Sequence, residues 1–203
     1  MPGGPLVDGA ESPTSEEAVT FTPTVAAVML TAEKGRKRGR ILKPIKIVAS
    51  SDHAGLKLRK VLVEQLRNRG VDVEDLGPHS AEPIDYPDEA AKVAHRVGVG
   101  AGEDVRGLLV CGSGVGMCMA ANKVDGVRAV DAWNVESARL SRAHNDANVL
   151  CLGERLLSEA DASAILEAWL VTPFEGGRHA RRVATVDHMD DRVVTAPHAA
   201  QCK

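Results

Sequence analysis

The chain has 203 residues, a formal net charge of −3 at pH 7 and 44% hydrophobic residues, but only 2% aromatic residues. This length suits one domain with an appended segment, and the apolar share is enough for one packed core. The shortage of aromatic rings argues against proteins that stack single-stranded nucleic acid. The small net charge gives no global field that would attract DNA or an acidic membrane.

The first 44 residues differ in composition from the rest and are predicted to be a flexible extension. Residues 1–33 carry five acidic side chains and no Lys or Arg, whereas residues 34–46 carry seven basic side chains and no acidic one. Residues 1–17 can bury little surface, because they mix Pro, Gly, Ser, Thr and Glu. The basic run 34–40 is interpreted first as a solvated linker, with a nuclear-localisation or anion-binding patch as the alternative.

Membrane and metal signals are missing from the sequence. No apolar run reaches the length of about 18 residues that a transmembrane helix needs, and no secretory leader opens the chain. The four cysteines show neither a CxxC pair nor the spacing of a zinc site. We therefore expect a cytoplasmic protein that binds no metal.

From residue 45 onward, short apolar runs alternate with amphipathic stretches. The predicted strands are residues 45–49, 71–76, 107–111, 127–130 and 149–152. The predicted helices are residues 56–69, 87–99, 115–123, 135–144, 158–170 and 177–191, with Ser158 as a cap. Strands that alternate with helices in this way predict an α/β fold, a parallel sheet with helices on both faces.

Ligands of such sheets bind at the carboxyl ends of the strands, and one loop there combines a cysteine with glycines. Cys111 ends a predicted strand and the glycine-rich loop 112–116 opens a helix, an arrangement that lets backbone N–H groups approach an anion and favours a thiolate. An ordinary turn with an inert cysteine is the alternative. A second alternative is a dinucleotide-binding fingerprint, because Asp131 lies 19 residues after Gly112, although Met117 stands where the third glycine belongs.

Further polar residues near the predicted loops each allow two interpretations. Asp52 and His53 follow the first strand, where they could bind a sugar phosphate or be a capping Asp with an exposed His. His144 could move a proton at neutral pH, while its neighbour Asn145 also suits a helix-ending turn. Tyr86 belongs either to a turn or to the site.

Arginines supply candidate phosphate ligands. Arg178 and Arg182 are four residues apart, which places both guanidinium groups on one helix face, suited to a phosphate or merely to solvent. Arg155 follows the last predicted strand, where the anion of a substrate could reach it.

The order of these motifs resembles ribose-5-phosphate isomerase type B, a family that also holds the allose- and galactose-6-phosphate isomerases. The resemblance covers residues 45–190. The motifs that carry it are Ser51-Asp-His-Ala-Gly55, Asp85-Tyr-Pro87, Cys111-Gly-Ser-Gly-Val-Gly116, Ala121-Asn-Lys123, Gly126-Val-Arg-Ala129, Ser141-Arg-x-His-Asn-Asp-x-Asn148, Gly153-x-Arg155 and Glu175-Gly-Gly-Arg-His179. It implies a Rossmann-like three-layer α/β/α sandwich with a five-stranded parallel sheet and a C-terminal helix, and no cofactor.

The resemblance also implies roles. Cys111 matches the base that moves a proton between C1 and C2, and Ser113 matches a position that holds the enediolate oxygen. His144 matches the residue that opens the sugar ring, with Asp52 and Asn145 nearby. The substrate contacts implied by the match are His53, Tyr86, Gly112, Gly114, Gly116, Asn145, Arg155, Arg178 and Arg182.

We therefore expect an isomerase domain over residues 45–191, between the extension 1–44 and a tail at 192–203. Its expected reaction is the interconversion of ribose 5-phosphate and ribulose 5-phosphate, in a homodimer with interfacial active sites or in a tetramer. The alternatives are a hexose 6-phosphate isomerase and a non-catalytic sugar-phosphate or dinucleotide-binding module. No nucleic-acid or membrane partner is expected.

Overall fold

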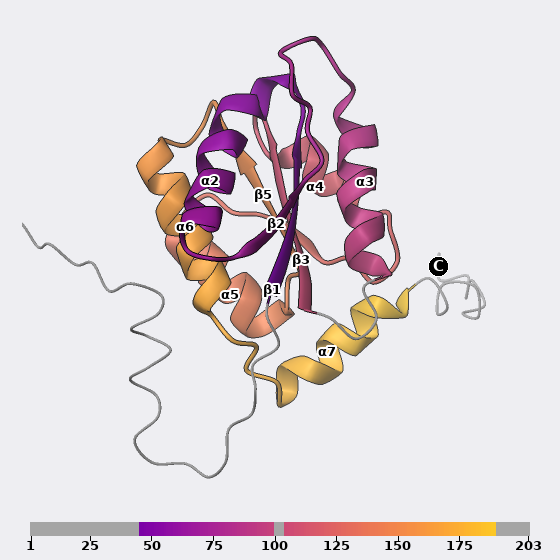
Figure 1. The fold of residues 1–203 in the computed structure, drawn as a ribbon. Helices are drawn as coiled ribbons and strands as arrows, with labels where there is room; N and C mark the ends of the chain where they lie inside the picture. The colour runs from indigo at the N-terminus through magenta and orange to yellow at the C-terminus, as the bar shows by residue number, and fades with distance from the viewer. Residues whose placement is uncertain (1–44, 100–103, 190–203) are drawn as a thin grey trace, which may run out of the picture. The chain divides into compact units, whose positions relative to one another are not determined.

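A single parallel sheet organises the computed structural model, which describes residues 45–99 and 104–189. The strand order is β2-β1-β3-β5-β4 (Figure 1). The strands are β1 (Ile45–Ser51), β2 (Asp72–Asp75), β3 (Asp104–Cys111), β4 (Ala129–Asp131) and β5 (Val149–Gly153). This confirms the predicted five-stranded parallel sheet. The expected extension 1–44 with its basic run and the expected tail 192–203 lie outside the described residues.

Helices cover both faces of the sheet. They are α2 (Leu56–Asn68), α3 (Tyr86–Gly98), α4 (Val115–Ala121), α5 (Val135–Asn145), α6 (Glu159–Val171) and α7 (Arg178–Asp187), with a 3₁₀ turn η1 (His53–Gly55) after β1. Helices α2, α5 and α6 share one hydrophobic cluster with the sheet, and α3 and α4 share the other. Among the described residues, no helix is long and apolar enough to span a membrane.

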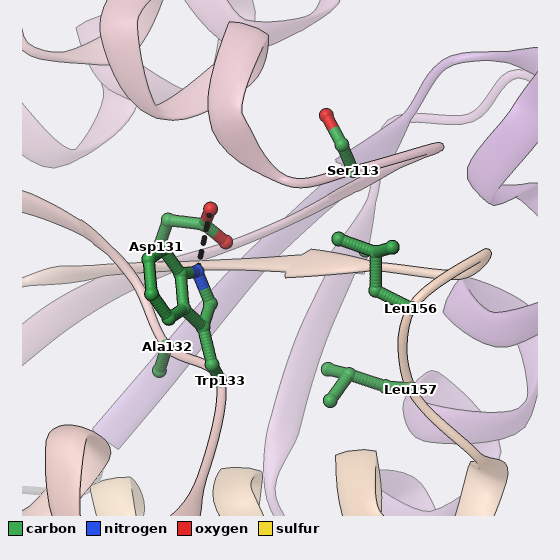
Figure 2. Close-up of a pocket in the computed structure, with 7 residues that line it drawn as sticks. Ser113, Asp131, Ala132, Trp133, Leu156 and Leu157 are labelled. Atoms are coloured by element: carbon green, nitrogen blue, oxygen red, sulfur yellow. Dashed lines mark hydrogen bonds between the residues drawn. The ribbon is translucent and has the colours of Figure 1, made fainter.

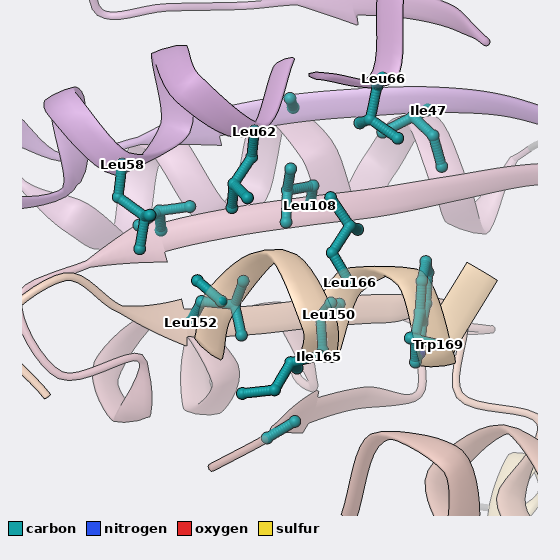
Figure 3. Packing of buried hydrophobic residues seen from close by; sticks show 14 of the residues in the cluster. Ile47, Leu58, Leu62, Leu66, Leu108, Leu150, Leu152, Ile165, Leu166 and Trp169 are labelled. Atoms are coloured by element: carbon teal, nitrogen blue, oxygen red, sulfur yellow. The ribbon is translucent and has the colours of Figure 1, made fainter. Parts of the chain in front are cut away.

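Both faces of the central strands are buried, which explains their continuous apolar runs. Leu108 and Val110 of β3 point to the first cluster, which Figure 3 shows, while Leu109 and Cys111 point to the second. Trp169 of α6 is fully buried in the first cluster. Apart from Trp169, the buried core is aliphatic, so close packing of aliphatic side chains rather than ring stacking stabilises it.

The end of α4 and the start of β4 differ from the predicted boundaries, because a side chain forms hydrogen bonds with the backbone between them. Helix α4 ends at Ala121 rather than at residue 123, and β4 begins at Ala129 rather than at residue 127. The amide of Asn122 donates to the Ala129 carbonyl at 2.9 Å and accepts from the Ala129 N–H at 2.8 Å. This two-way pairing ends the helix early and fixes the start of the strand.

The crevice of the sheet lies between β1 and β3. The chain leaves β1 for β2 on one side, whereas β3 and the later strands lie on the other side, which is the switch point where α/β sheets bind ligands. The Asp52 N–H donates to the Val110 carbonyl at 3.2 Å, which ties the loop after β1 to the end of β3. Gly55 packs so closely on this strand that a Cβ atom there would overlap Val110.

Replacing Gly55 by Ala should therefore destabilise the fold by about 3 kcal/mol, because backbone must move to make room. Gly70→Ala is the matched control, since it meets no atom within 4 Å and pays only for its left-handed backbone, about 1–2 kcal/mol. Urea unfolding of both variants measures the difference. Equal losses would contradict the close packing of Gly55.

Candidate active site

The glycine loop after β3 holds the sulfur of Cys111. Cys111 is the last residue of its strand and is 5% exposed. The Gly114 N–H donates to Cys111 Sγ at 3.1 Å, and Gly114 has a φ of +83°, which favours glycine. This hydrogen bond fixes the position of the sulfur within the loop. The loop thus holds the thiol directly before helix α4, which has seven residues.

Arg155 and Tyr86 flank this loop. A Cβ atom on Gly112 would lie 3.0 Å from Arg155 Nη1, and one on Gly116 would lie 2.9 Å from the Tyr86 ring. The Arg155 N–H also donates to the Gly112 carbonyl at 3.0 Å. The phosphate ligand and the tyrosine predicted from the sequence are therefore neighbours of the cysteine loop, and glycine is what lets them approach.

Asp52 and His53 complete the group at the carboxyl edge of the sheet. The Asp52 carboxylate accepts hydrogen bonds from the N–H groups of Ala54 and Gly55, at 2.9 and 3.0 Å. His53 is exposed, and its Nδ1 accepts from the Ile84 N–H at 3.3 Å. Asp52 is thus a capping residue and His53 is exposed, as the structural interpretation predicts. The same hydrogen bonds hold both side chains beside the crevice.

A second group of predicted site residues lies at the opposite edge of the sheet. Helix α5 leads from the carboxyl end of β4 to the amino end of β5 (Figure 1). His144 and Asn145 end this helix and therefore lie at the amino edge. The rings of His144 and His179 stack with centroids 4.3 Å apart, which brings α7, with Arg178 and Arg182, to the same place.

The two groups do not meet within one chain. Strand β3 has eight residues, which at about 3.3 Å per residue separates the two edges by roughly 25 Å. The expected proximity of Asp52 to His144 is therefore not found within one copy. One copy carries the cysteine half of the predicted site at one edge and the histidine–arginine half at the other.

Glu175 and His179 belong to one of the motifs named above, but the sequence predicts no role for them. Glu175 Oε2 lies 3.7 Å from His144 Nε2 and 3.9 Å from His179 Nε2. Burial, followed by the charges of His144 and Arg178, lowers the pKa of His179. Their contacts with His144 join segments more than 30 residues apart, which no local pattern reveals.

These three side chains are close enough together to be considered as metal ligands, and they are the one such group in the part of the chain described. Their geometry does not suit an ion. The two rings lie only 2° from parallel, so their lone pairs do not converge, and Arg178 Nε already donates to His179 Nε2 at 3.3 Å. We assign no metal site to them.

A pocket of about 330 Å³ lies between Ser113 of the cysteine loop and the residues that follow β4 and β5. Figure 2 shows the side chains that line it. Asp131 at its wall accepts a hydrogen bond from the Trp133 indole at 3.1 Å. Its other oxygen, Oδ1, is buried without a partner and lies against Gly114. A dinucleotide-binding acid must reach a ribose hydroxyl, and this carboxylate is already packed into the loop. The geometry therefore disfavours the dinucleotide alternative.

Comparison with known proteins gives consistent matches. Residues 47–186 match the family model described as Ribose/Galactose Isomerase. Ribose-5-phosphate isomerase B of Escherichia coli (strain K12) is 45% identical over 147 residues, which are 72% of this chain and 97% of that protein. D-erythrulose-4-phosphate isomerase of Pectobacterium atrosepticum is 36% identical over 148 residues, 72% of this chain and 95% of that protein.

Solved structures agree with these matches. Ribose-5-phosphate isomerase B of Clostridium thermocellum is 44% identical with a TM-score of 0.70, and the alignment covers 73% of this chain and 99% of that one. The enzyme of Mycoplasma genitalium with bound ribulose-5-phosphate is 41% identical with a TM-score of 0.69, covering 73% and 98%.

Asp131 allows a prediction about pH. Burial raises the pKa of Asp131 in the folded protein, so its charged form costs stability at neutral pH, and this cost disappears as the pH falls to the unfolded value near 4. Asp131→Asn keeps an oxygen for the Trp133 indole. It should raise the free energy of unfolding at pH 7 by up to about 1 kcal/mol after solvent screening, and the gain should shrink toward pH 4.

Thermal unfolding across this pH range tests the effect, with Glu64→Gln on the exposed side of α2 as the matched control. A loss of stability in Asp131→Asn at pH 7 would show that the ionised carboxylate stabilises the loop instead.

Proposed function

The chain belongs to the Ribose/Galactose Isomerase family, and from that membership we propose that it interconverts ribose 5-phosphate and ribulose 5-phosphate. The proposal is supported by relatives of that name and by the neighbour with bound ribulose-5-phosphate. The observation that carries it in this chain is the Cys111 sulfur held at 3.1 Å by the Gly114 N–H at the switch point of the sheet.

Cys111 acts as the base of the isomerisation. Its thiolate takes the proton from C2 of the open-chain aldose, and the electron pair moves toward the C1 carbonyl oxygen to form an enediolate. A proton then passes from the C2 hydroxyl to the C1 oxygen, the C2 carbonyl forms, and the Cys111 thiol returns its proton to C1. Such positioned proton transfer contributes about 10²–10⁴-fold to a rate. Ser113 and the loop N–H groups hold the enediolate oxygen, and one such donor is worth roughly 2.7–4 kcal/mol.

The remaining site residues bind the substrate and open its ring. His144 with Asn145 opens the furanose, and His53, Arg155, Arg178 and Arg182 contact the phosphate and hydroxyl groups. Tyr86, whose ring lies beside Gly116, contacts the substrate next to the cysteine loop, and Asp52 meets His144 only across two copies.

A complete site therefore needs the carboxyl edge of one copy and the amino edge of another. This follows because one copy keeps Cys111 and His144 at opposite edges of the sheet. We propose a homodimer with two shared sites, built from residues 45–191, with residues 1–44 as an appendage outside the matched region. A reducing cytoplasm suits a thiolate base, because thiolates oxidise readily.

Cys111→Ala should lower kcat for ribose 5-phosphate by roughly 10²–10⁴-fold, since the proton then has no base. Calorimetry should still detect sugar-phosphate binding, because the loop donors and arginines remain. Cys118→Ala is the matched control, as Cys118 lies on α4 with its sulfur 3.5 Å from the Ala129 carbonyl. Near-normal turnover by Cys111→Ala would remove Cys111 as the base.

The shared site can be tested by mixing two inactive variants, Cys111→Ala and His144→Asn. Random pairing makes about half of the dimers mixed, and each mixed dimer has one complete site, so roughly a quarter of wild-type activity should return. The two variants are unfolded, mixed and refolded together, and each variant refolded alone is the control. A mixture as inactive as its components would mean that both residues serve one site within the same copy.

A further inference from the structure

Glu175 and His179 lie against His144 but have no part in the function proposed above. The His144 and His179 rings stack 4.3 Å apart with their planes 2° from parallel. The carboxylate oxygen of Glu175 faces Nε2 of both rings, at 3.7 and 3.9 Å. The cluster joins the end of α5 to the start of α7.

The backbone fixes Glu175 in this position from both sides. Its N–H donates to the Ala143 carbonyl at 3.0 Å, one residue before His144. Gly176 and Gly177 follow with φ values of +64° and +55°, and the His179 N–H donates back to the Gly176 carbonyl at 3.0 Å. The two glycines thus provide the turn that brings both Glu175 and His179 onto the same imidazole.

His179 forms an uncharged wall for His144. Arg178 Nε donates to His179 Nε2 at 3.3 Å, and a nitrogen that accepts a hydrogen bond carries no proton. Burial lowers the pKa of His179 as the largest effect, in the same direction. A neutral, 7% exposed ring stacked on His144 restricts how the His144 ring can tilt.

Glu175 is the negative group that can balance a positive charge on His144. Arg178 and Arg182 of α7 are positive, and Arg139 on α5 is paired with Glu136 at 2.7 Å. Glu175 supplies the one carboxylate within ion-pair distance of His144 in the described part of the chain. Glu136 also lies near enough for its charge to act on His144, but it is paired with Arg139, so without Glu175 no carboxylate of the described residues would lie within ion-pair distance of His144.

We propose that Glu175 is a positioning residue for His144, orienting its imidazole against His179 and stabilising the charge that His144 gains during ring opening. This rests on the proposed function. In that step His144 takes the proton of the C1 hydroxyl while the bond from C1 to the ring oxygen breaks. The electron pair stays on the ring oxygen, which takes a proton from water.

A shorter sugar separates ring opening from isomerisation. Erythrose 4-phosphate cannot close a five-membered ring, because the hydroxyl on its C4 is phosphorylated, so its isomerisation needs no ring opening. Ribose 5-phosphate needs both steps. The two substrates therefore report on Glu175 and on Cys111 differently, and a relative already bears the name of an isomerase for the matching ketose, D-erythrulose 4-phosphate.

Glu175→Gln should lower kcat/KM for ribose 5-phosphate about two- to fivefold, the range for a partly exposed ion pair, and leave kcat/KM for erythrose 4-phosphate unchanged. Glu175→Asp should recover part of the loss. Cys111→Ala should lose both activities. Equal losses on both sugars, or no loss on the pentose, would overturn the proposal.

NMR gives a readout that does not depend on turnover or on acceptance of the tetrose. The ring ¹H and ¹⁵N signals of His144 should move in Glu175→Gln and in His179→Ala, but not in Glu64→Gln, which is exposed on α2. Unmoved His144 signals would overturn the positioning role. If the wild-type protein isomerises no pentose phosphate while these signals move, the proposed function fails and the contact stands.

Discussion

All five strands run in the same direction, and this constraint decides where each functional side chain can lie. Every loop that follows a strand emerges at the carboxyl edge, and every helix returns the chain to the amino edge. Cys111 therefore belongs to one edge because it ends β3, and His144 to the other because it ends α5. No change of rotamer brings them together, so a reaction that uses both residues must join two copies.

The glycines of the cysteine loop are explained by what touches them. A side chain at Gly112 would meet Arg155, and one at Gly116 would meet Tyr86. Gly153, at the end of β5, faces the loop from outside, and a side chain there would meet the backbone of Ser113. Close packing around the loop thus explains the glycine spacing that resembles a degraded dinucleotide fingerprint. Asp131 packs against Gly114 and accepts a hydrogen bond from Trp133, an arrangement that disfavours a contact with ribose.

The sequence predicted the sheet well because β1 and β3 are buried on both faces and read as uninterrupted apolar runs. The rule that ligands bind at the carboxyl ends of parallel strands selects the loops after β1 and β3 as candidate site loops. The local sequence pattern could not predict side-chain contacts between residues that lie far apart in the chain. The contact of Glu175 with His144 depends on how α7 packs, and the early end of α4 depends on the pairing of Asn122 with Ala129.

Contacts within one copy hold the candidate site residues of the amino edge in place. Trp169 in the core lies under the guanidinium of Arg142, at 5.7 Å from its ring centroid, and Arg142 pairs with Asp146 at 2.8 Å. Arg128 then links Asp146 to Asp187 of α7, at 3.1 and 3.0 Å.

This chain of contacts connects the hydrophobic core to the helix that carries Arg178 and Arg182, so α7 is fixed relative to His144 within one copy. Two prearranged halves lose less conformational entropy on meeting than two flexible ones. In the shared site proposed above, the separation over two edges is compatible with catalysis, because contacts within one copy already hold the amino-edge residues in place.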